Sequence, residues 1–70
     1  MLTTTQIKYR VLSDCRQLSS GTIASLIGKV DYETIDLVQD HFVRFVSAMI
    51  PTRNWATWVE AWEAFKVSVA

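Results

Sequence analysis

Apolar and polar positions alternate along the chain with the spacing of α-helices, most clearly between residues 31 and 50. One set of apolar residues in this stretch is spaced three and four residues apart: Ile35, Val38, Phe42, Phe45 and Met49, with Val46 widening the stripe. Because residues three and four apart share one side of a helix, the spacing predicts a helix with one buried face. Asp31 stands where an N-cap accepts from free backbone N–H groups, and Pro51 stands where the helix should stop.

The same spacing predicts three further helices. Their approximate ranges are 3–18, 22–29 and 54–69. A threonine is expected to cap the first, Gly28 to help end the second, and Thr52 or Asn54 to cap the last. The apolar stripe of the last helix consists of Trp55, Trp58, Trp62, Phe65 and Val69. Two matched stripes joined by a short turn predict an antiparallel hairpin of the third and fourth helices.

These elements predict an all-α fold class. Residues 1–70 are expected to form a single, compact four-helix domain built on the hairpin, with a helix-turn-helix-like segment at 22–40. A chain of this size buries only about 60% of its unfolded surface, so its core is small. Half of the residues are apolar, and three of them are tryptophans. The surplus of apolar side chains predicts association with a second copy or another protein.

The composition of the chain predicts its cellular compartment and limits the classes of partner that it favours. No segment approaches the roughly 20 apolar residues that cross a bilayer, and the first residues lack the basic and apolar blocks of a signal peptide. With one cysteine in the chain, these features predict a soluble cytoplasmic protein with no membrane partner. Seven basic residues balance seven acidic ones, so the net charge favours neither nucleic acid nor anionic lipid.

Few side chains are candidates for chemistry. Cys15 falls within the apolar stripe of the first helix, where a cysteine acts as a small buried hydrophobe, and its spacing from His41 suggests no catalytic pair. One cysteine and one histidine are too few ligands for a closed zinc site. We therefore expect no enzyme activity, no catalytic residues, no metal, no cofactor and no small-molecule substrate.

Several charged residues are expected to lie on solvated helix faces. Arg10 and Asp14, four residues apart, predict a weak surface ion pair, and Asp40 and Arg44 predict another. An acidic ridge is predicted on the third helix. It consists of Glu33, Asp36 and Asp40. Such a ridge could steer the protein toward a basic partner surface.

Residues 23–38 resemble the helix-turn-helix of small DNA-binding regulators. Ala24 matches the small residue that lets the two helices cross, Gly28 matches the glycine of the turn, and Ile35 and Val38 match the anchors of the second helix. The resemblance implies a DNA-binding transcriptional regulator that acts as a dimer. Its DNA-contacting residues would be Lys29, Tyr32, Thr34 and Gln39. The acidic third helix disfavours nucleic acid, because its carboxylates repel phosphates.

The tryptophan stripe is the other candidate binding surface. Trp58 and Trp62 are expected to contribute mainly to the core, whereas Trp55 opens the predicted helix and has the clearest access to a partner. A smaller patch is predicted on the third helix. It consists of Leu37, His41 and Ala48. The partner-binding candidates are therefore Trp55, Trp58, Trp62, Leu37, His41, Glu33, Asp36 and Asp40.

The functional expectation is a small non-enzymatic adaptor or modulator that binds proteins through helical surfaces. It would self-associate, as a dimer, or dock on a larger protein. Its size and style are typical of phage- or plasmid-type regulators and inhibitors, which is an analogy only. The alternative is the helix-turn-helix DNA-binding regulator.

Overall fold

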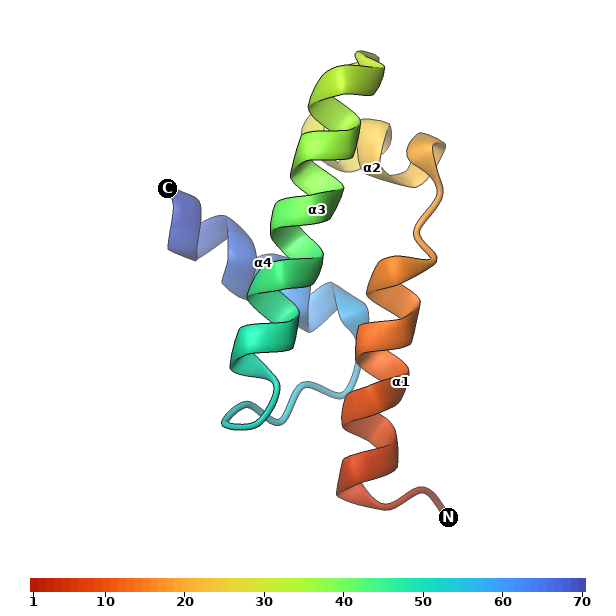
Figure 1. Cartoon of the computed structure of the whole chain (residues 1–70), viewed down its shortest axis with the longest axis vertical. Coiled ribbons are helices and arrows are strands. Elements are labelled where there is room, and N and C mark those ends of the chain that lie inside the picture. Colours follow the sequence, from red (N-terminus) through yellow and green to blue (C-terminus); the bar gives the residue numbers. More distant parts are fainter.

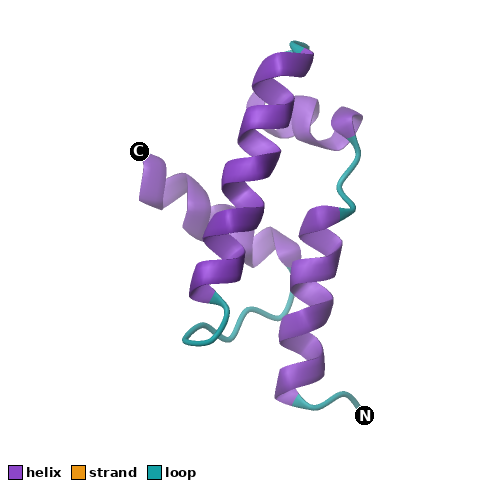
Figure 2. Ribbon diagram, viewed as in Figure 1, coloured by secondary structure: helices purple, strands orange, loops and turns teal.

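The computed structural model describes residues 1–70 and contains four α-helices and no strand. The helices are α1 (Thr4–Arg16), α2 (Ser20–Ile27), α3 (Tyr32–Met49) and α4 (Trp58–Val69). α1 and α3 lie side by side and run in opposite directions, while α4 crosses behind α3 (Figure 1). Figure 2 shows helices joined by loops, the longest of them between α3 and α4. The predicted all-α, four-helix class is therefore confirmed.

Local capping determines where the first three helices begin and end. The Thr3 hydroxyl accepts from the Gln6 N–H at 3.1 Å, and the Gln6 side chain accepts from the Thr3 N–H at 2.8 Å, which forms a capping box. Gly28 follows α2 in the left-handed conformation, with φ of 71°. The Asp31 carboxylate accepts from the Glu33 N–H at 3.3 Å and caps α3. These caps confirm the predictions made for them.

The start of α4 was predicted incorrectly. The helix begins at Trp58, so neither Thr52 nor Asn54 caps it, and Trp55 lies in the loop before it. The N-cap residue Thr57 makes no side-chain cap bond. Instead, the Glu60 carboxylate accepts from the backbone N–H of Ala56 at 2.6 Å. This bond satisfies a main-chain donor at the helix start, where a negative charge is also favourable.

The main core lies where α1, α3 and α4 meet. Its buried members are Val11, Leu12, Cys15, Phe42, Val46, Ala61, Trp62 and Phe65. The Phe42 ring lies 5.1 Å from the Trp62 ring in an edge-to-face arrangement and 5.4 Å from the Phe65 ring. These contacts join the two arms of the predicted α3–α4 hairpin. Val69, expected in the same stripe, is 66% exposed because it lies at the end of α4, beyond the core.

α2 packs against α3 alone. Ile23 on α2 and Ile35 on α3 are fully buried, outside the eight-residue core. α2 crosses the N-terminal half of α3 (Figure 1), which is the predicted helix-turn-helix-like arrangement. No helix has both the length and the apolar character needed to cross a membrane.

Candidate functional site

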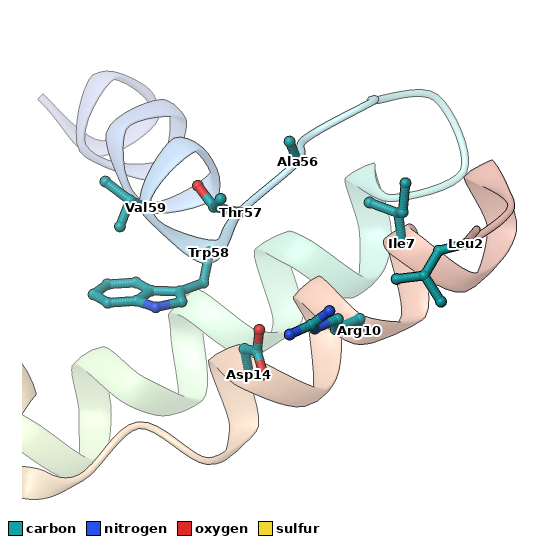
Figure 3. Close-up of a pocket in the computed structure, with 8 residues that line it drawn as sticks. All are labelled: Leu2, Ile7, Arg10, Asp14, Ala56, Thr57, Trp58 and Val59. Carbon is teal, nitrogen blue, oxygen red and sulfur yellow. The ribbon is translucent and has the colours of Figure 1, made fainter.

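A hollow of about 460 Å³ lies between α1 and the start of α4 (Figure 3). Its lining consists of Leu2, Ile7, Arg10, Asp14, Ala56, Thr57, Trp58 and Val59. A second hollow, of about 340 Å³, shares two of these residues. Its lining is Thr4, Ile7, Asn54, Trp55 and Ala56. We call the two hollows together the tryptophan groove.

Contacts between distant parts of the chain hold the loop that forms one wall of the groove. The Lys8 ammonium group donates to the carbonyl of Pro51 at 3.2 Å, which ties the loop to α1. The Trp55 ring lies 6.0 Å from the Phe45 ring at an interplanar angle of 33°, which ties the loop to α3. The cap bond of Glu60 holds the end of the loop against α4. The groove is therefore bounded by elements that are fixed to the core.

The three tryptophans have different surroundings. Trp55 and Trp58 are half-buried and line the groove, as the partner-surface hypothesis requires. Trp62 is only 5% exposed and packs in the core, so the structure corrects its assignment as a partner-binding residue. Leu2 and Val59, which the sequence reasoning missed, expose 47% and 49% of their surface and line the same hollow as Trp58. Their apolar character was visible, but their proximity depends on tertiary packing.

Arg10 and Asp14 are the charged residues of the groove. Both lie on the α1 wall, beside Trp58 (Figure 3). The ion pairs of the structure are Arg44–Asp40, at 3.0 Å, and Lys66–Glu63, at 3.1 Å. The first of these was predicted, whereas the predicted pair between Arg10 and Asp14 does not form. The groove therefore combines an apolar floor with two opposite charges that have no ion-pair partner.

The acidic ridge lies on α3, away from the groove lining. Glu33, Asp36 and Asp40 are all exposed, as predicted for a solvated face. Arg44 neutralises part of the ridge through its ion pair with Asp40. Arg16 of α1 lines a shallow hollow of about 360 Å³ together with Asp36 and Asp40. The sequence did not indicate this second arginine, because it comes from another helix.

The smaller apolar patch also belongs to α3. Leu37 is 55% exposed, and His41 and Ala48 are exposed on the same side of the helix. No residue of α3 lines the tryptophan groove. The tryptophan groove therefore shares no lining residue with the acidic ridge or with this patch.

Two of the four DNA-contacting candidates, Thr34 and Gln39, form side-chain hydrogen bonds within the chain. Lys29 and Tyr32 are exposed. The Thr34 hydroxyl donates to the Asp31 carboxylate at 2.6 Å, and this hydrogen bond lowers the pKa of Asp31. The Gln39 side-chain amide donates to the main-chain carbonyl of Leu18, just after α1, at 3.1 Å. Contact with a base by Thr34 or Gln39 would require these bonds to break.

Cys15 is fully buried in the core. Desolvation, with a contribution from the charge of Asp14, raises the pKa of its thiol to about 12, so the reactive thiolate is disfavoured. His41 lies exposed on α3, where it cannot face a thiol enclosed by the core. No three His, Cys, Asp or Glu side chains gather in a way that could hold a metal ion.

Comparisons with protein-family models, with curated proteins and with solved structures found no match to this chain. The fold defines a small all-α domain of four helices.

Proposed function

We propose that this chain is a small non-enzymatic adaptor or modulator that binds protein through the tryptophan groove, either a second copy of itself or a larger protein. The observation that carries the proposal is the pair of half-buried tryptophans, Trp55 and Trp58, in adjoining hollows. Tryptophan and arginine are enriched among the residues that contribute most to binding energy, particularly in pockets from which a partner displaces the water.

The shape and chemistry of the groove favour a protein partner. Its two hollows, of about 460 and 340 Å³, adjoin through Ile7 and Ala56, which gives an elongated surface. Exposed Leu2 and Val59 extend its apolar area. A protein segment could fill such a groove with side chains from successive turns of a helix. No cluster of three metal-ligating side chains forms in the structure, and the proposal assigns the groove no reaction.

The acidic ridge supplies a second means of partner selection. Three exposed carboxylates on α3 would attract a basic surface and accelerate encounter with it. The nearby arginines, Arg16 and Arg44, reduce this field, so we assign the ridge to steering and the groove to affinity.

The DNA-binding alternative remains a prediction that has less support. The α2–α3 arrangement suits it, but the intramolecular hydrogen bonds of Thr34 and Gln39 and the carboxylates of the ridge do not. Retention on duplex DNA as salt is raised tests it directly. Binding that falls steeply with salt would support the alternative, and no retention at low salt would exclude it.

The groove proposal can be tested with a phage-displayed library of randomised peptides selected on the folded chain. We expect selected peptides to lose binding to a Val59→Arg variant, in which a long charged side chain blocks the groove. Val67→Arg is the matched control, because Val67 is exposed on the same helix but does not line the groove. Selected peptides that bind both variants as well as the unmodified chain would contradict the proposed site.

A further inference from the structure

Arg10 and Asp14 lie one helical turn apart on the α1 wall of the tryptophan groove and carry opposite charges. Residues at this spacing on a helix commonly form an ion pair, yet these two do not. Arg10 is exposed, whereas Asp14 is half-buried. The groove thus presents one positive and one negative group side by side, both available to an occupant.

Two other charged side chains near this wall make hydrogen bonds within the chain. Lys8 donates to the carbonyl of Pro51 at 3.2 Å, and Glu60 accepts from a backbone N–H at 2.6 Å. Any occupant that covers the groove removes water from Arg10 and Asp14. Loss of this hydration is costly unless each group meets an opposite charge, so the occupant should carry an acid and a base with the same spacing in reverse order.

A second copy of the chain meets this requirement. If two α1 helices pack antiparallel about a two-fold axis between Arg10 and Asp14, Arg10 of each copy faces Asp14 of the other. The axis generates both ion pairs at once and closes the assembly at two chains. The apolar lining beside these charges, Ile7 and Trp58 included, would be covered in the same event.

We propose that the tryptophan groove is the interface of a two-fold symmetric homodimer, held in register by reciprocal Arg10–Asp14 ion pairs between the copies. This inference rests on the proposed function, because it names the protein that fills the binding groove. It follows from the juxtaposition, in one exposed hollow, of two self-complementary charges and Trp58, with Trp55 in the adjoining hollow.

Charge reversal provides the test. Arg10→Asp places two acids at the interface of each copy, and Asp14→Arg places two bases there. Each variant alone should raise the dimer dissociation constant by about tenfold or more, because like charges then meet across the axis. Mixed in equal amounts, the two variants should form a heterodimer, since every acid again faces a base. The double variant R10D/D14R should dimerise alone.

Sedimentation of each sample, with circular dichroism to verify helical content, measures these outcomes. The matched control is Glu63→Lys combined with Lys66→Glu, a reversal of an exposed ion pair on α4 outside the groove and the acidic ridge, which should leave dimerisation unchanged. If a single variant folds poorly, the double variant keeps the inference falsifiable, because it retains both charges and its failure to dimerise would overturn the reciprocal ion pairs. Dimers that persist in both single variants, or failure of the mixture and the double variant to recover, would overturn the inference.

The result is separable from that of the proposed function. An unmodified chain that stays monomeric, yet binds displayed peptides in a way that Val59→Arg abolishes, would overturn the homodimer and retain the groove as a site for a foreign protein. A monomeric chain whose peptide binding ignores Val59→Arg would overturn both.

Discussion

Trp58 and Trp62 lie one turn apart on α4 and belong to the same sequence pattern, but they occupy different environments. Trp62 is 5% exposed, with its ring edge-to-face against Phe42 at 5.1 Å. Trp58 is half-buried and lines a hollow of about 460 Å³. The helical period places both residues on one face, but it does not determine how completely other elements cover that face.

The difference arises from which face of α1 each tryptophan shares. Near Trp62, the core contains buried Val11 and Cys15 from α1. Near Trp58, the same helix presents Arg10 and Asp14, whose charged ends retain water and leave the indole partly uncovered. We call the stretch of α4 around Trp62 the closed end, because apolar packing covers it, and its first turn, around Trp58, the open end, because part of that indole stays exposed.

The largest effect should come from the closed end. Phe42 is fully buried and contacts both Trp62 and Phe65, so Phe42→Ala should lower the free energy of unfolding by ~3–5 kcal/mol. Urea denaturation measures this change. A loss below ~1 kcal/mol would mean that the three rings do not form the centre of the core.

Shortening a tryptophan side chain should cost less stability at the open end than at the closed end. Trp58→Ala should cost about 1–2 kcal/mol of unfolding free energy, because part of the indole is already in water. Trp62→Ala is the matched comparison and should cost roughly 3–5 kcal/mol. Both are measured at low protein concentration, where association adds no stability. Equal costs for the two variants would remove the distinction between the closed and open ends.

Two glycines extend the comparison to α2, which packs against α3 and does not contact α4. Gly28→Ala should destabilise by about 1 kcal/mol, because φ of 71° is unfavourable for a residue with a Cβ. Gly21→Ala should stabilise by ~0.5–1 kcal/mol, because Gly21 is helical and an added Cβ would meet only the Ser19 hydroxyl oxygen, at 3.9 Å. Thermal unfolding distinguishes the two signs, and a shared sign would contradict this description of α2.

The smallest effect concerns pH. The hydrogen bond from Thr34 lowers the pKa of Asp31 in the folded chain, so its contribution to stability is fully present above the unfolded pKa of about 4. That contribution is lost as pH falls through the lower, folded value. Asp31→Asn keeps a capping side chain but removes this titration, so its unfolding free energy should fall less steeply below about pH 4. Identical acid slopes in the two chains would contradict the capping role.

The helix ends that the sequence predicted correctly depend on local interactions. Thr3 with Gln6, Gly28, and Asp31 all act within a few residues of the chain, which is why the beginnings of α1 and α3 and the end of α2 could be anticipated. The all-α class followed from the apolar spacing for the same reason.

The incorrect predictions involve contacts across the fold. Trp55 fits the helical spacing of α4, but it lies in the loop, where it packs against Phe45 of α3. Arg10 and Asp14 have the spacing of an ion pair, but both line a groove completed by residues near Trp58. The groove could not be anticipated because its walls are distant in sequence, although every residue in it was visible.

The central claim is that the open end of α4 forms a self-complementary binding surface with α1. Sedimentation equilibrium of the unmodified chain, over a wide concentration range at low and moderate salt, tests it most directly. The mass should rise from one chain to two and stop there, with weaker association at higher salt because the ion pairs are screened. The mass of a single chain at every concentration, or growth beyond two chains, would contradict the claim.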